Sequence, residues 1–161
     1  MADWKIRSYV LRSVKLPVTY RKVLEEFGSR YCVPFCGNGV RFEEIFGNNR
    51  QVFAEIGFGA GDFLFSTAVR RSFDNFIGLE VFLQGLGKLV YRLHEKGITN
   101  VRVINEDAAL VFAGMIPAES LSGIHIMFPD PWPKKKHKKR RLLTAEFASL
   151  LLASLVPGGY I

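Results

Sequence analysis

The sequence lacks any apolar run long enough to cross a membrane. A membrane-spanning helix needs about 18 or more consecutive apolar residues. The longest candidate, Phe147–Val156, has ten residues and includes two serines. The first residues, MADWKIRSYVLRS, carry charges where a secretory signal has its apolar stretch. These absences predict a soluble, cytoplasmic protein with no membrane partner.

Cysteine and histidine are also scarce, which argues against two common kinds of site. The two cysteines, Cys32 and Cys36, are too few for a disulfide framework. No histidine lies near them in the sequence, so we expect free thiols and no metal site. His125 falls inside an expected strand and is interpreted as a core residue. We assign no catalytic role to His94 or His137.

Acidic residues are outnumbered, and the excess of positive charge is local. The chain has 22 Lys and Arg against 15 Asp and Glu, a formal net charge of +7. Residues 134–141 (KKKHKKRR) hold seven of these cations, and without them the chain would be formally neutral. Like charges at this density repel, so the run should lie in solvent or against a polyanion such as nucleic acid. Alone, the run leaves both readings open.

From residue 52 onward, short apolar runs alternate with helical patterns. Expected strands cover 52–56, 76–81, 101–104 and 124–128, with a fifth starting at 160–161. Expected helices cover 63–71, 86–97, a short stretch up to 115, and a segment for which Thr144 is the expected N-cap and whose apolar face includes Leu155. This alternation predicts a doubly wound α/β fold with a mainly parallel sheet. Ligands of such sheets bind beyond the carboxyl ends of the strands.

Residues 1–51 are less regular. Val18–Phe27 is expected to form one helix, and Cys32–Asn49 has the glycines and proline of a loop. We therefore expect residues 1–51 to form an N-terminal extension with a helical segment, and residues 52–161 to form the ligand-binding domain. The chain of 161 residues contains no internal repeat or low-complexity linker.

A glycine-rich turn and three acids lie at the ends of the first three expected strands. The first strand ends at Glu55-Ile56, and Gly57-Phe58-Gly59-Ala60-Gly61 follows, with aspartate at position 62 where a dinucleotide fingerprint has glycine. Glu80 lies about 20 residues beyond the turn, where an acid can take the hydroxyls of an adenosine ribose. Asp107 follows the third strand, and capping of the next helix is an equal alternative for it. Together these residues favour an adenosine-type cofactor.

The fourth expected strand ends in a stiff turn that leads into the basic run. Three prolines lie within Pro129–Pro133, and each fixes φ and lacks an N–H donor. Such a turn presents Asp130 and Trp132 at a defined position, the first to accept hydrogen bonds from a base and the second to stack on it. The adjacent cations can hold phosphates. A rigid surface loop with a half-buried Trp is the alternative.

At these positions the sequence resembles the bacterial tRNA (guanine-N7)-methyltransferases, which use S-adenosylmethionine and have the Rossmann-like class I methyltransferase fold. The resemblance extends over nearly the whole chain, including the leader Arg7–Arg12. Its most specific part is Phe-Pro-Asp-Pro-Trp at 128–132 with the Lys/Arg run; the other resembling stretches are 55–61, 78–81 and 105–108.

The resemblance implies a role for several residues. Its implied cofactor-binding residues are Glu55, Gly57, Gly59, Glu80, Asp107 and Asp130, and the substrate-contacting lysine is Lys134. Asp130 is also the implied catalytic acid at the reaction centre. Residues 52–161 would then be the S-adenosylmethionine-binding domain, tRNA the partner, and methyl transfer to a guanine N7 the reaction.

The chain departs from the family pattern in two places. Val81-Phe82-Leu83-Gln84-Gly85 stands where the family has Val-His-x-Pro-Gly. The family fold also continues through two more strands, so the resemblance implies that the last strands are missing from a chain ending at Ile161. Two other functions stay open on the residues alone: an amino-group methyltransferase acting on another nucleic acid, and a non-catalytic RNA-binding module. The aspartate at position 62 and the motif after the fourth expected strand argue against a third, a nicotinamide-dependent oxidoreductase. The sequence leaves the oligomeric state open.

Overall fold

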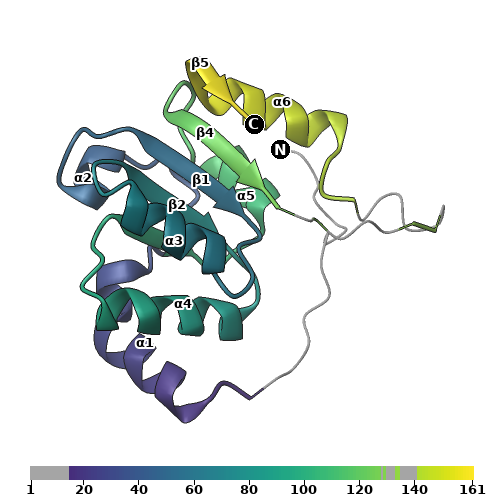
Figure 1. The fold of residues 1–161 in the computed structure, drawn as a ribbon. Helices are drawn as coiled ribbons and strands as arrows, with labels where there is room; N and C mark the ends of the chain where they lie inside the picture. Colours follow the sequence, from purple (N-terminus) through teal and green to yellow (C-terminus); the bar gives the residue numbers. More distant parts are fainter. Residues whose placement is uncertain (1–14, 128, 130–132, 135–140) are drawn as a thin grey trace.

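The protein is built around a five-stranded parallel sheet with strand order β3-β2-β1-β4-β5 (Figure 1). The structure, a computed structural model, describes residues 15–127, 129, 133–134 and 141–161. The strands are β1 (Val52–Ile56), β2 (Asn75–Leu79), β3 (Val101–Ile104), β4 (Leu121–Ile126) and β5 (Leu155–Tyr160). The order of strands reverses between β1 and β4, as in a doubly wound sheet. The predicted α/β class is confirmed.

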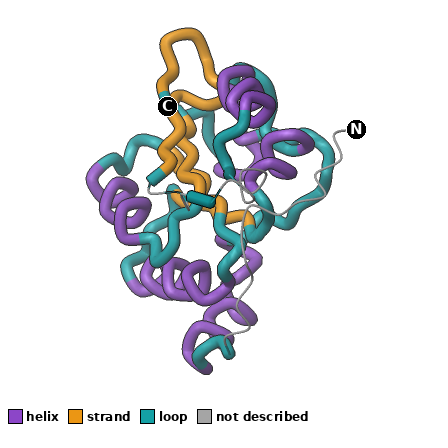
Figure 2. Tube along the Cα trace, turned by 90° about the vertical axis from the view of Figure 1, so that its right-hand side faces the viewer, coloured by secondary structure: helices purple, strands orange, loops and turns teal. Residues whose placement is uncertain are grey.

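Helices cover both faces of the sheet. The helices of the described residues are α1 (Val18–Tyr31), α2 (Phe42–Phe46), α3 (Asp62–Arg70), α4 (Leu83–Glu95), α5 (Ala108–Gly114) and α6 (Ala145–Ser154). One apolar core joins the sheet to α1, α3 and α4, and a second joins it to α2, α5 and α6. Figure 2 shows the strands between these two layers of helices.

The central strand β1 serves both cores because its side chains alternate. Phe53 packs with the α3 and α4 side, whereas Val52, Ala54 and Ile56 pack with the α5 and α6 side. Every residue of β1 and β2 is buried. Parallel strands covered on both faces are expected to be apolar throughout. The one acid of β1, Glu55, is therefore an exception that needs a reason.

Two strands begin and end as predicted, whereas β2, expected over 76–81, covers Asn75–Leu79, and β4 also differs. β1 and β3 have the expected bounds, but β4 begins at Leu121 and ends at Ile126, instead of covering 124–128. The ladder explains the difference: Phe53 of β1 pairs with Gly123, and Leu121 pairs with β5. Because β4 pairs with a strand on each side, residues that precede its apolar run also become part of the strand.

The expected end of the last helix was wrong. Leu155 was predicted to lie on the helix, but α6 ends at Ser154 and β5 includes Leu155, Pro157 and both following glycines. The β4–β5 ladder is irregular, since Leu121 pairs with Leu155 and Gly123 with Tyr160. The extra residues of β5 loop out between these two pairs, which accommodates a proline and glycines in a strand.

Residues 15–51 pack on the sheet. Val23 and Tyr31 of α1 belong to the core shared with α4, and Cys32 forms a bridge with Val103 of β3. The predicted loop over 32–49 contains α2, a short helix that buries Phe42 and is followed by Gly47 with φ of +70°. Five residues are too few for periodicity to reveal a helix.

The predicted cap of α6 is present and can be tested. Thr144 accepts a hydrogen bond from the N–H of Phe147 at 3.2 Å. Replacing it by alanine should lower the free energy of unfolding by about 1 kcal/mol because that N–H loses its partner. Urea unfolding of Thr144→Ala, with Thr144→Ser as the variant that keeps the hydroxyl, measures this. Equal stability of the wild-type and alanine proteins would show that the cap contributes nothing.

Candidate functional site

The turn after β1 lies at the carboxyl end of the sheet and depends on its glycines. Gly57, Gly59 and Gly61 all have positive φ, +71°, +56° and +76°. Side chains rarely adopt this conformation, so glycine is required at each position. The N–H of Gly57 donates to the carbonyl of Leu79 of β2, and that of Gly61 donates to the carbonyl of Phe58, both at 2.8 Å. The turn is thus fixed to β2 as well as to β1.

Glu80 joins the loops that follow β1 and β2. One carboxylate oxygen, Oε2, accepts a hydrogen bond from the N–H of Gly59 at 2.8 Å, and Oε1 accepts one from the N–H of Phe82 at 2.9 Å. The loop after β3 is attached at the same place, because Asn105 Nδ2 donates to the carbonyl of Glu80 at 2.7 Å. Three successive strand ends therefore meet around this one residue.

Glu55 is a buried carboxyl at the same edge of the sheet. Glu55 is 2% exposed, and its Oε2 has no hydrogen-bond partner among the described residues. Burial raises the pKa of Glu55 from 4.5 to about 7, and the negative charge of Glu80 adds to the rise. A carboxyl in this state is typical of a site where a ligand supplies the missing partner.

Asp107 caps the helix that follows β3. Its Oδ1 accepts a hydrogen bond from the N–H of Ala109 at 2.8 Å, so the capping alternative is realised. The neighbouring Glu106 accepts from the N–H of Asp107 at 2.8 Å. Asp107 is the N-cap of α5 and lies three residues beyond the end of β3, the strand that pairs with β2.

The predicted reaction centre lies largely outside the described residues. Asp130, Trp132 and residues 135–140 are among those that the structure does not describe. Lys134 is described and is exposed to solvent. β4 ends at Ile126 next to Ile56 of β1, so the chain enters this segment at the same edge of the sheet as the glycine turn.

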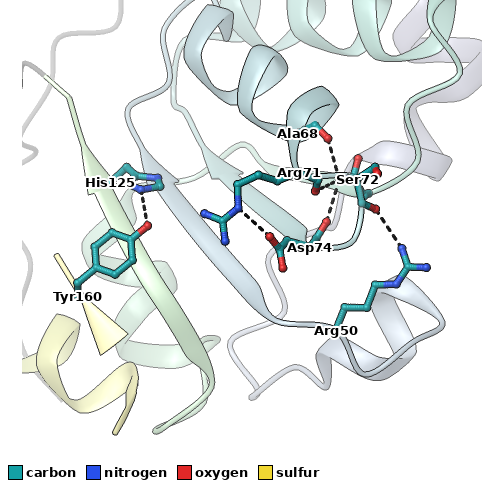
Figure 3. Close-up of polar contacts among 8 residues, drawn as sticks. Arg50, Ala68, Arg71, Ser72, Asp74, His125 and Tyr160 are labelled. Carbon is teal, nitrogen blue, oxygen red and sulfur yellow. Dashed lines mark hydrogen bonds and ion pairs between the residues drawn. The ribbon is translucent and has the colours of Figure 1, made fainter. Parts of the chain in front are cut away.

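His125 is half-buried and belongs to a polar contact on the α3 side of the sheet (Figure 3). Its Nε2 lies 3.1 Å from the hydroxyl of Tyr160, and Phe63 contacts its ring edge-on. Burial and the Arg71 guanidinium lower the pKa of His125. Arg71 is itself paired with Asp74 in the same view. These contacts fit a packing role.

The cysteines and the remaining acids form no metal centre in the part of the chain described. Cys32 and Cys36 are both free thiols, and burial raises the pKa of Cys32 to about 11. The described residues contain no group of three or more His, Cys, Asp or Glu that could hold a metal ion. Among these residues, no helix is both long and apolar enough to cross a membrane.

Gly85 of α4 also lies at this edge, and its contact with the glycine turn was not predicted from the sequence. A Cβ built on Gly85 would overlap the carbonyl oxygen of Gly59 and would lie 2.9 Å from its carbonyl carbon. The helix can therefore abut the glycine turn only because residue 85 has no side chain. A glycine inside an otherwise periodic helical pattern was the available signal.

Known proteins place this chain in a family. The profile of a family described as "Putative methyltransferase" matches residues 49–161. A tRNA (guanine-N(7)-)-methyltransferase of Nitrosomonas eutropha is 44% identical over 156 residues, which cover 97% of this chain and 70% of that protein. The chain belongs to the tRNA (guanine-N(7)-)-methyltransferase family. The enzyme of that name from Bordetella pertussis is 42% identical over 97% of this chain.

Solved structures of methyltransferases share the fold of this family member. The match to Haemonchus contortus phosphoethanolamine N-methyltransferase 2, solved with S-adenosyl-L-methionine, has a TM-score of 0.53 at 17% identity and covers 73% of this chain and 25% of that one. The antibiotic-resistance methyltransferase Kmr matches with a TM-score of 0.52 at 20% identity, over 73% of this chain and 60% of that one. The predicted class I methyltransferase fold is confirmed. The chain spans 61% of the length of the Bordetella relative.

The pKa of Glu55 makes the stability of the protein depend on pH. The folded protein holds this proton up to about pH 7, whereas the unfolded chain releases it near 4.5, so stability falls as the pH rises from about 4.5 to 7. Glu55→Gln cannot ionise. Relative to the wild type, it should gain up to about 3 kcal/mol in free energy of unfolding between pH 5 and pH 8.

Urea unfolding at the two pH values measures this difference. Glu25→Gln, which changes an exposed carboxyl of α1, is the matched control and should show no such gain. If Glu55→Gln and Glu25→Gln respond to pH alike, the carboxyl of Glu55 ionises normally in the folded protein.

Proposed function

We propose that the protein transfers the methyl group of S-adenosylmethionine to N7 of a guanine in tRNA, in the cytoplasm. Glu55 carries the cofactor part of this proposal. It is a buried carboxyl whose Oε2 has no hydrogen-bond partner among the described residues, beside a glycine turn in a methyltransferase fold. The α-ammonium group of the cofactor is a donor that would satisfy this oxygen and favour the ionised carboxylate.

The other acids fit the rest of the cofactor. Each oxygen of a carboxylate can accept two hydrogen bonds, and each oxygen of Glu80 receives one from the backbone. Glu80 thus keeps the capacity to accept the ribose hydroxyls. Gly57 and Gly59 let the cofactor approach the backbone of the turn, and Asp107 borders the same edge of the sheet. Asp130 is proposed to border the cofactor from the segment after β4.

The substrate part of the proposal rests on the relatives and on the basic segment. The relatives are named as tRNA (guanine-N(7)-)-methyltransferases. Residues 134–141 supply seven cations directly after the proline-rich turn. Lys134 and its neighbours would hold tRNA phosphates, which positions the RNA without reading its sequence. Trp132 would support the base or the turn.

The proposed reaction requires alignment more than proton transfer. The cofactor, when bound, supplies an electrophilic methyl group on a sulfonium. In neutral guanine, N7 already has an in-plane lone pair, so no base is needed to expose the nucleophile. The protein's work is to align N7 with the methyl group and to offset the positive charge that develops on the ring. Asp130 suits both tasks, because a carboxylate can hold a base edge and stabilise a cation.

Calorimetric titration with S-adenosylhomocysteine, using NAD as the control ligand, tests the cofactor site. We expect the first to bind and the second not to bind. Asp130→Ala should keep this affinity and lose methyl transfer to tRNA by at least about 100-fold, because alignment and charge stabilisation are lost together. Full transfer by Asp130→Ala, or methylation of an exocyclic amino group instead of N7, would overturn the assignment. Binding of tRNA without binding of S-adenosylhomocysteine would indicate a non-catalytic RNA-binding module.

The basic run should determine how tRNA binding responds to salt. Replacing Lys138, Lys139, Arg140 and Arg141 by glutamine should reduce the magnitude of the slope of log affinity against log salt concentration by up to about 3. A variant that makes fewer phosphate contacts releases fewer counterions when it binds. Lys96→Gln is the control, because Lys96 is exposed at the end of α4, on the opposite edge of the sheet. An unchanged slope in the fourfold variant would mean that the run does not contact RNA.

A further inference from the structure

Helix α4 lies against the glycine turn over three successive contacts. Gly85 abuts the carbonyl of Gly59, Leu89 fills the space in front of Gly61, and Arg92 forms an ion pair with Asp62. Gly85, Leu89 and Arg92 are spaced i, i+4 and i+7, so they form one stripe along the helix. The turn from residue 59 to residue 62 therefore follows a single face of α4.

The contact at Gly85 is made by backbone on both sides. Gly85 lies within α4 and its φ is helical, so its conformation does not require glycine. Glycine is unfavourable inside a helix, and its presence is explained here by the close approach of the Gly59 carbonyl. An added methyl group could not be accommodated by the rotation of a side chain, because the atoms it would meet belong to the main chain.

Gly59 is held from its other side as well. Its N–H donates to Glu80, whose second oxygen accepts from the N–H of Phe82, the residue that precedes α4. The peptide groups of Gly59 are therefore enclosed between the Glu80 carboxylate and the first turn of α4. At the far end of the turn, Asp62 is paired with Arg92, and Lys88 Nζ lies 3.9 Å from the same carboxylate.

We propose that α4 positions the cofactor-binding turn, and that Gly85 is the positioning residue that allows it to do so. This inference rests on the proposed function, because it assumes that the turn at 57–61 binds S-adenosylmethionine. A helix that abuts the turn at three points sets the conformation of the turn before the ligand arrives, and such preorganisation strengthens binding. Gly85 itself would not touch the cofactor.

The test compares two glycines of the same helix. A Cβ on Gly87 would lie 2.8 Å from Tyr20 Cβ of α1, so Gly87→Ala introduces a smaller overlap on the same helix, away from the turn. Calorimetric titration with S-adenosylhomocysteine should give a dissociation constant at least about tenfold higher for Gly85→Ala, with a stoichiometry near one. Gly87→Ala should stay within about twofold of the wild type, since it leaves the preorganised turn alone.

The possible results separate the two proposals. Wild-type affinity in Gly85→Ala, an equal loss in both variants, or a reduced stoichiometry at unchanged affinity would overturn the positioning role. Failure of the wild-type protein to bind S-adenosylhomocysteine would overturn the proposed function and this inference with it. If Gly85→Ala does not fold, Arg92→Gln provides the test. Its affinity for S-adenosylhomocysteine should be about twofold to fivefold lower, because loss of the Arg92–Asp62 ion pair releases one end of the turn. Unchanged affinity there would overturn the inference.

Discussion

A parallel sheet covered by helices on both faces confines polar chemistry to the ends of its strands. Here β1 and β2 are buried along their whole length, and their amino acids contribute to two apolar cores at once. Ionised carboxylates are best accommodated where the strands give way to loops and backbone N–H groups are available. The glycine turn and the acids after the strands follow from this constraint, because the carboxyl ends of adjacent parallel strands meet at one edge.

The two glutamates at this edge illustrate how position decides chemistry. Glu80 lies just beyond β2, where two backbone N–H groups reach its carboxylate. Glu55 lies one residue before the end of β1, where burial and the nearby charge of Glu80 raise its pKa to about 7. One acid thus organises the loops, and the other is a buried carboxyl whose neutral form is favoured up to about pH 7. The same residue type gives a structural clamp and a carboxyl with a raised pKa.

Much of this edge could be predicted from the sequence because its signals are local. Apolar runs fixed β1 and β3, the glycine spacing located the turn, and the distance along the chain located Glu80. Residue patterns are informative where a residue's role depends on its neighbours in the chain. The cap at Thr144 was found for the same reason.

What the sequence could not show depends on contacts between distant segments. The importance of Gly85 lies in its distance to Gly59, which no periodicity reports. The helix α2 is stabilised by burial of Phe42 rather than by its own length. The bounds of β4 and β5 were wrong because pairing with a neighbouring strand, not local propensity, decides which residues become extended.

The pair that ends the β4–β5 ladder determines which way the end of β5 faces. One residue of β4 lies between its two pairs with β5, whereas four residues of β5 lie between the same two pairs. Because the alternation of side chains is interrupted where β5 loops out, the pairing of Tyr160 with Gly123 decides which face Tyr160 occupies. In this pairing, Tyr160 places its ring over Phe53 and its hydroxyl beside His125. A slip of the pairing by one residue would turn that aromatic ring toward the layer of α5 and α6.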